Sequence, residues 1–193
     1  MGYIGNQITT VFPTSISVDS ATISGNTTIG GTLGVTGATT LSNQLTDANM
    51  SAGSVVQVVS ASHSTRVDST STSYADSGLT CNITPSSSSN KVLAIVSQNL
   101  GQDRDAQEAD GSVQLLRDST SIYENTKMSL LESGGSSTAK NIDNSPITIL
   151  DSPSSTSALT YKTQIKCNTT SSNGTSRANW GGASHIILME IVG

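Results

Sequence analysis

Hydrophobic and polar positions alternate in short blocks over most of the chain. From about residue 54 onward, apolar stretches are separated by clusters of Ser, Gly, Asn and Pro, which is typical of strands joined by turns. The clearest block is LTYKTQIKC, where Leu159, Tyr161, Ile165 and Cys167 share one face of an extended chain. No block has a helical period. The blocks that predict strands are SVVQVVS, GLTCNI, KVLAIVS, SVQLLR, KMSLL, ITIL, LTYKTQIKC and HIILMEIV. We expect residues 54–193 to form an antiparallel, jelly-roll-like β-sandwich.

Residues 21–46 follow a six-residue period instead. The aliphatic positions of this period are Ile23, Ile29, Val35 and Leu41, each followed two positions later by Gly or Asn. Because six is even, an extended chain presents all of them on one face. Four hexads are too few for one chain to bury that face as a β-helix. We expect residues 21–53 to be a short shaft and connector in which three parallel chains intertwine. A flexible Gly/Thr linker is the alternative.

Residues 1–20 carry apolar side chains without any period. This segment holds the only phenylalanine of the chain, and its expected contact residues are Tyr3, Ile4, Ile8 and Phe12. A free tail usually lacks such residues. We therefore expect residues 1–20 to be an extended segment that anchors the protein to a partner.

The closing block, HIILMEIV, is apolar on both faces of a strand. One face carries Ile187, Met189 and Ile191, and the other carries Ile186, Leu188 and Val192. Both faces must be covered, one by the domain core and one by something else. A neighbouring subunit is the simplest cover, and a loop over a central strand is the alternative. We expect Ile187, Leu188, Met189 and Ile191 to form an interface strand, with Glu190 near a Lys or Arg of the next chain.

Composition and charge narrow the function classes. Apolar residues make up 34% of the chain, aromatic residues 3% and charged residues 12%. A charge-poor chain rich in Thr, Val, Ile, Gly, Asn and Ser favours an all-β fold over disorder. The net charge of −5 disfavours nucleic-acid binding, and no apolar stretch is long enough for membrane insertion. The N-terminus matches neither a secretory signal nor a myristoylation motif, so we expect synthesis in a cytoplasm without an export signal.

Candidates for metal or redox chemistry are few. Cys81 and Cys167 lie on the apolar faces of their blocks, and we expect both to be buried rather than to form a disulfide or a metal site. The acidic loop GQDRDAQEADGS carries Asp103, Asp105, Glu108 and Asp110. It does not match the ligand order of an EF-hand, so we favour a solvated loop, with calcium binding as the alternative.

Catalytic motifs are not found. Ser184 and His185 are adjacent, so a strand would point them to opposite faces and prevent a nucleophile–base pair. Phosphate-loop, dinucleotide and Gly-x-Ser-x-Gly motifs are missing. A pair of glycosidase acids is left open by the sequence. Trp180, near Arg177, suits either sugar stacking or the filling of one end of the sandwich, which we favour. We predict no enzymatic activity, no cofactor and no metal.

The stretch ATISGNTTIGGTLGVTGATTLSN resembles the slender trimeric shafts of fibre proteins of tailed bacteriophages, especially those of marine phages. The block YADSGLTCNITPSSSSNKVLAIVS, together with LTYKTQIK and IILMEI, is similar to a small β-domain at the ends of such fibres. The start YIGN is similar to N-terminal segments of phage structural proteins. This resemblance to a class covers most of the chain. It implies a homotrimer carried on a virion, made in the host cytoplasm, and it brings no catalytic residues.

Three functions follow as hypotheses. The first is a non-enzymatic virion fibre on the tail or the head, bound to other virion proteins through residues 1–20, whose β-domain meets a host-surface glycan or protein. The second is a capsid decoration protein of similar architecture that covers joints of the shell. The third is a polysaccharide depolymerase, which the 3% aromatic content disfavours because sugar grooves need aromatic side chains.

Overall fold

The computed structural model describes residues 32, 34, 36, 37, 50–104, 110–126, 139–168 and 174–193. The chain divides into two units, Met1–Ser42 and Asn43–Gly193, and every described strand belongs to the second. The predicted shaft positions Ile23, Ile29, Val35 and Leu41, and the predicted anchor 1–20, lie outside the described residues. Within the described ranges, no helix is long and apolar enough to cross a membrane.

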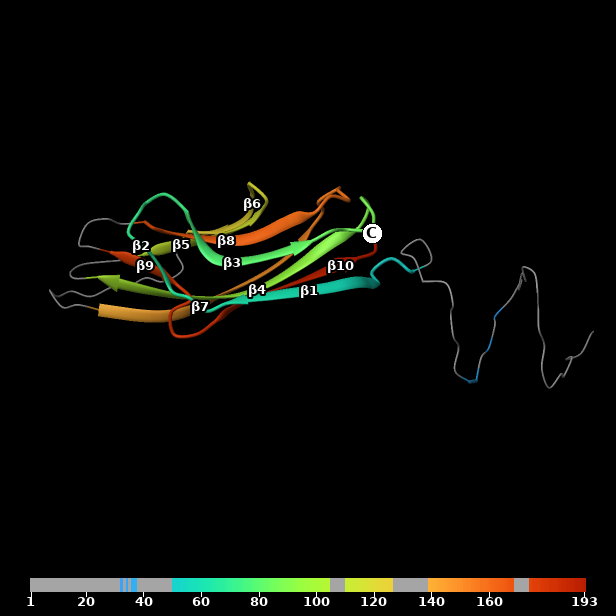
Figure 1. Ribbon diagram of the computed structural model, residues 1–193, viewed down its shortest axis with the longest axis horizontal. Coiled ribbons are helices and arrows are strands. Elements are labelled where there is room, and N and C mark those ends of the chain that lie inside the picture. The colour runs from blue at the N-terminus through green and yellow to red at the C-terminus, as the bar shows by residue number, and fades with distance from the viewer. Residues whose placement is uncertain are drawn as a thin grey trace, which may run out of the picture. The chain divides into compact units, whose positions relative to one another are not determined.

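The second unit is a sandwich of two antiparallel sheets. A six-stranded sheet, here the long sheet, has the order β1-β10-β4-β9-β2, with β7 on the other side of β4, and a four-stranded sheet, here the short sheet, has the order β3-β8-β5-β6. Figure 1 shows the two sheets as packed layers. The predicted fold class, an all-β chain with an antiparallel sandwich, is confirmed. The strands are β1 Val55–His63, β2 Val67–Ser69, β3 Ala75–Ile83, β4 Lys91–Arg104, β5 Gly111–Arg117, β6 Thr120–Asn125, β7 Ala139–Asp151, β8 Leu159–Cys167, β9 Thr175–Ala178 and β10 Ser184–Ile191.

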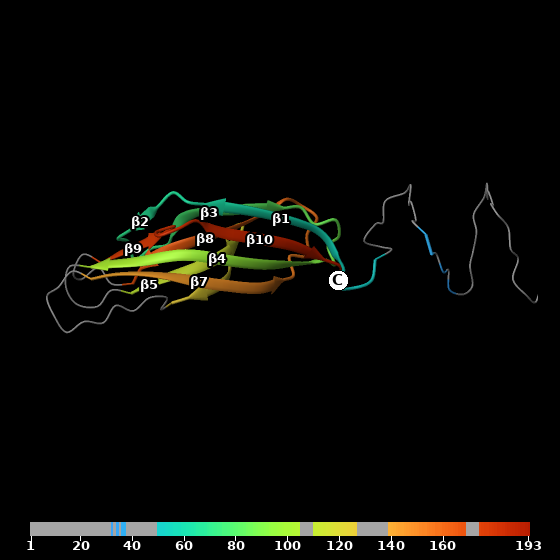
Figure 2. The same ribbon diagram turned by 90° about the horizontal axis from the view of Figure 1, so that it is seen from below.

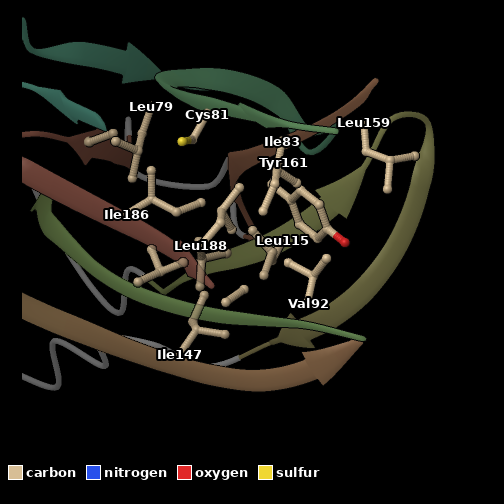
Figure 3. Close-up of a cluster of buried hydrophobic side chains, with 14 of the residues drawn as sticks. Leu79, Cys81, Ile83, Val92, Leu115, Ile147, Leu159, Tyr161, Ile186 and Leu188 are labelled. Atoms are coloured by element: carbon tan, nitrogen blue, oxygen red, sulfur yellow. The ribbon is translucent and has the colours of Figure 1, made fainter. Parts of the chain in front are cut away.

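The strands form because their apolar residues recur at every second position. In β8, each odd-numbered residue from Leu159 to Cys167 is buried and each even-numbered one is partly exposed, as the alternation predicted. The inward side chains of both sheets meet in one apolar core, where Tyr161, Leu115 and Leu188 are 0% exposed (Figure 3). Burying each such side chain stabilises the fold by about 1.5–3 kcal/mol.

Strand β4 is the axis of the long sheet. It pairs with β7 along its whole length, and on its other side first with β10 and then with β9. In the short sheet, β3 carries a bulge between Asp76 and Thr80. Gly78 in this bulge has φ +88°, and a Cβ there would collide with the imidazole of His63. Glycine is therefore required at this position both for its backbone conformation and for close packing.

One part of the interior is polar rather than apolar. The buried amide of Gln98 donates to Ser184 Oγ at 2.8 Å, and its Oε1 accepts from Thr163 Oγ1 at 2.6 Å. Asn179 Nδ2 in turn donates to the carbonyl of Ser77 at 2.7 Å and to that of Thr65 at 2.9 Å. These groups satisfy one another, as buried polar groups must if their burial is not to destabilise the fold.

Most of the strands predicted from the sequence are confirmed, but some described strands were not predicted. Seven of the eight predicted blocks coincide with described strands, whereas KMSLL lies outside the described residues. Three strands were not predicted: β2, β6 and β9. They are short, at three, six and four residues, so period-two alternation has few positions in which to show.

Candidate interaction surface

Strand β10 has two apolar faces with different surroundings. Ile186 and Leu188 point into the core and are 0% exposed. Ile187, Met189 and Ile191 lie on the opposite, outer face of the long sheet and are partly exposed. Of the four residues predicted for an interface strand, Leu188 therefore belongs to the core, and the other three lie on the outer face.

The outer face of β10 is the middle of a larger apolar surface. Strand pairing places Val58, Met189, Leu93 and Leu150 in one row across β1, β10, β4 and β7. The next row holds Ser60, Ile187, Ile95 and Thr148. Figure 2 shows these four strands side by side. Val58 is 55% exposed and Leu150 is 54% exposed. We call these two rows, together with Ile191 and Val55, the apolar outer face.

The outer face of the short sheet has the opposite chemistry. The corresponding row across β3, β8, β5 and β6 is Asp76, Gln164, Gln114 and Glu124. Gln164 donates to Asp76 at 2.6 Å, and Gln114 donates to Gln164 at 2.6 Å. Lys162 forms an ion pair with Asp76 at 2.9 Å. Leu116 lies beside Lys162 and is only 7% exposed. The outer face of the short sheet is therefore mainly polar, and its side chains hydrogen-bond one another, although Gln114 is itself only 9% exposed.

Glu190 lies on the inner face of β10 and is held by its own chain. Its carboxylate accepts hydrogen bonds from Asn90 Nδ2 and the backbone amide of Ser86 at 2.7 Å each, and from Gln57 Nε2 at 2.5 Å. Burial alone would raise the pKa of Glu190, but the hydrogen bonds from Asn90, Gln57 and Ser86 together lower it below its ordinary value. The predicted pairing with a basic residue of the next chain is therefore not needed: Glu190 fastens the 86–90 loop to β10.

The sequence predicts that Trp180 fills one end of the sandwich, and this prediction is wrong. It covers Gly101 of β4 on the outside of the long sheet, where a Cβ on Gly101 would collide with its ring. The guanidinium of Arg177 lies over the indole at 4.7 Å and pairs with Asp103 at 2.6 Å. Since Arg177 occupies a ring face that a sugar would use for stacking, the site does not favour carbohydrate binding.

The other candidate residues lie partly outside the described part of the chain. Asp103 pairs with Arg177, while Asp105 and Glu108 of the acidic loop lie outside the described residues. Within the described part of the chain, no three His, Cys, Asp or Glu side chains gather as a metal site requires. Cys81 and Cys167 are both buried, as predicted. Ser184 is buried and His185 is exposed, which confirms that their side chains point to opposite faces.

Sequence analysis missed the residues that extend the apolar face beyond β10. Val58, Leu93 and Leu150 come from the blocks SVVQVVS, KVLAIVS and ITIL, which also carry apolar residues at consecutive positions. Each of these blocks therefore carries a two-sided signal. The signal is weaker than in HIILMEIV because the three blocks are shorter, so each is also consistent with a strand that is buried on one side.

Comparison with known proteins gives similarity at the level of structure alone. No protein-family model and no curated protein matches the chain. Among solved structures, the VP2 subviral particle of infectious bursal disease virus aligns with a TM-score of 0.37 and 15% identity, over 71% of this chain and 33% of that one. The Gx strain of the same virus gives a TM-score of 0.35 and 12% identity, over 72% and 39%. The chain thus spans about a third of those proteins, and likenesses with TM-scores below 0.5 carry no argument about function.

Proposed function

We propose that this chain is a non-enzymatic structural protein of a virion, a homotrimeric fibre of a tailed bacteriophage that ends in the β-sandwich. The observation that carries the proposal is the line of Ile23, Ile29, Val35 and Leu41, which one chain cannot bury. Each side chain buried in a three-chain shaft would stabilise the assembly by about 1.5–3 kcal/mol. The described sandwich supports the proposal because it belongs to a compact unit, Asn43–Gly193, that follows the hexads along the chain, as a head domain after a shaft would.

The chemistry of the described residues supports a structural role. The buried polar groups around Gln98 donate to and accept from one another, and the hydrogen bonds described for them involve no His, Asp or Glu. General acid–base catalysis most often uses a His, Asp or Glu side chain within reach of a substrate. Lys162 forms an ion pair with Asp76, and Arg66 forms one with Asp68. Both ion pairs lie at the surface.

The position of the protein on the particle is part of the proposal. Residues 1–20 bind other virion proteins, and the sandwich faces outward toward a host-surface glycan or protein. A labelled antibody against the sandwich should mark the tail or sparse sites on the head of intact particles. Labelling over the whole shell would instead show the decoration protein that we considered as the alternative.

The mass of the full chain tests the trimer. Light scattering at micromolar concentration should give about 59 kDa, three times the chain mass of 19.8 kDa. Ile29→Asp combined with Val35→Asp should abolish the trimer. Thr28→Asp combined with Thr36→Asp places the same charges on the opposite face of an extended segment and should leave it intact. A monomer of the unaltered chain would contradict the proposal.

A further inference from the structure

We propose that the apolar outer face of the long sheet packs against the sandwich domain of a second copy of this chain. The inference rests on the proposed homotrimer, and it names the surface through which the head domains of the trimer meet. It concerns Val58, Leu93, Leu150, Ile187 and Met189, which come from four different strands. A solitary strand under a loop, the alternative considered for HIILMEIV, would not produce an apolar row across all four.

The chemistry of the face identifies the class of occupant. Its two rows contain no charged side chain, although the exposed Lys91 continues the row of Val55 and Ile191. The hydroxyls of the two rows, Ser60 and Thr148, lie at the two edge strands. A nucleic acid needs several basic residues, and a glycan needs hydrogen-bond donors and acceptors that converge, whereas these two hydroxyls lie at opposite edges of the rows. Transient protein partners bind surfaces about as polar as the rest of a protein, whereas interfaces between copies of one chain are more apolar. The apolar outer face therefore has the composition of an interface between copies of one chain.

The size of the face fits copies that are already tethered. At about 4.8 Å per strand, four strands span roughly 15 Å, and Ile187 to Ile191 along β10 spans about 14 Å. This is the size of the core of an interface, less than the roughly 800 Å² per partner of a free-standing complex. Tethered copies need less area, because a short linker holds the second domain at about millimolar effective concentration.

The chain supplies that tether. Val55, at the start of β1, follows Leu41, the last aliphatic residue of the hexads, by 14 residues. Fourteen residues of chain span at most about 50 Å. Chains that are joined at Leu41, as proposed, therefore keep their β1 strands within roughly 100 Å of one another. The outer face also has a hollow of about 360 Å³ lined by Ser60, Ser62, His185 and Ile187.

Photo-crosslinking in the full chain tests the inference. A benzophenone amino acid replaces Leu150, which is half exposed on an edge strand, and in a matched control it replaces Thr80 on the outer face of the short sheet. Light scattering gives the mass of each sample before irradiation. We expect a two-chain adduct from position 150 that peptide mapping places in the sandwich of another copy, and at least tenfold less adduct from position 80.

Each crosslinking outcome either upholds or overturns the contact through the apolar outer face. The mass of the sample tests the trimer separately. A position-150 adduct within one chain, to residues 1–49, would overturn it, since the chain's own N-terminal segment would then cover the face. An oligomer without an adduct at position 150, or with equal adducts at 150 and 80, would overturn it too. A dimeric mass with the expected adduct would uphold the face and refute the trimer. A monomeric mass without an adduct would refute both.

Discussion

The two outer faces of the sandwich can be compared row by row. On the long sheet, the row Val58, Met189, Leu93, Leu150 is apolar, whereas on the short sheet the row Asp76, Gln164, Gln114, Glu124 is polar. Both rows cross four antiparallel strands, so backbone geometry does not distinguish them. The two faces differ in the chemistry of their side chains. The polar side chains hydrogen-bond one another within their row, whereas the apolar row has no such means of stabilisation in water.

This difference shows that one strand can carry a stability role and an assembly role on its two sides. In β10, Leu188 is 0% exposed in the core, and Met189, the next residue, points outward. A substitution at the first position acts on the folded state itself. A substitution at the second acts on whatever covers the face. The predictions below separate these effects.

The largest effect is expected on the inner face. Leu188→Asp places an uncompensated charge in the core and should unfold the domain, and Leu188→Ala should reduce the free energy of unfolding by about 2–5 kcal/mol. Met189→Asp should leave the far-ultraviolet circular dichroism spectrum of a folded β-domain unchanged. Calorimetry and circular dichroism of the two Asp variants check this pair, and unfolding by Met189→Asp would remove the distinction between the faces.

The polar part of the interior should be nearly as sensitive. Gln98→Ala removes the hydrogen bonds of Gln98 with Thr163, Ser184 and Asn179, although each of these residues keeps another partner. A hydrogen bond contributes about 0.5–1.5 kcal/mol net, so we expect the loss of three to cost about 3 kcal/mol in chemical denaturation. Gln164→Ala, which removes an amide from the outer face of the short sheet, is the matched control and should cost less than about 1 kcal/mol. Equal losses would mean that the buried amides are not a stabilising network.

A charge on the apolar outer face should weaken the assembly. Leu150→Asp, at a half-exposed position, should lower the unfolding free energy of the assembled full chain by about 1.5–3 kcal/mol per copy, the value of one buried aliphatic side chain. Thr80→Asp adds the same charge beside Lys162 on the other sheet and should change it by less than about 0.5 kcal/mol. Thermal unfolding of the two variants at equal concentration measures the contrast, and identical midpoints would argue that the face is open to water.

Acid should loosen the loop that Glu190 fastens. Because the pKa of Glu190 is lower in the folded state than its ordinary value of 4.5, its ionised form stabilises the fold above that value. This stabilisation is lost as the pH falls from about 4.5 through the folded pKa. Glu190→Gln should therefore be less stable than the unaltered protein at pH 7 and should lose less on acidification. Unchanged pH dependence of the melting temperature in the variant would contradict this role.

The smallest effect is expected for the ion pair on the polar face. Lys162 is 28% exposed and Asp76 is 56% exposed, so water screens their attraction. Lys162→Ala should change the free energy of unfolding by less than about 1 kcal/mol, without altering the mass of the assembly. A change in mass would show that the short sheet, rather than the long one, lies between copies.

The sequence allowed the local part of this structure to be predicted. Period-two alternation predicted the inward positions Leu159, Tyr161, Ile165 and Cys167 of β8, and the two-sided block HIILMEIV predicted that the outside of β10 is apolar. The extent of the apolar face was not predictable, because Val58 and Leu150 reach the same row only through strand pairing between distant segments. The inward orientation of Gln98 and Thr163 escaped prediction as well, since polar residues in a strand are expected to face water.

An experimental structure of the assembled full chain tests the central claim most directly. The account predicts that Val58, Met189 and Leu150 of one copy lie within about 4.5 Å of apolar atoms of another copy, the distance of van der Waals contact. It also predicts that Asp76 and Glu124, at the two ends of the polar row, remain in solvent. An assembly in which the row from Val58 to Leu150 is open to water would contradict the account.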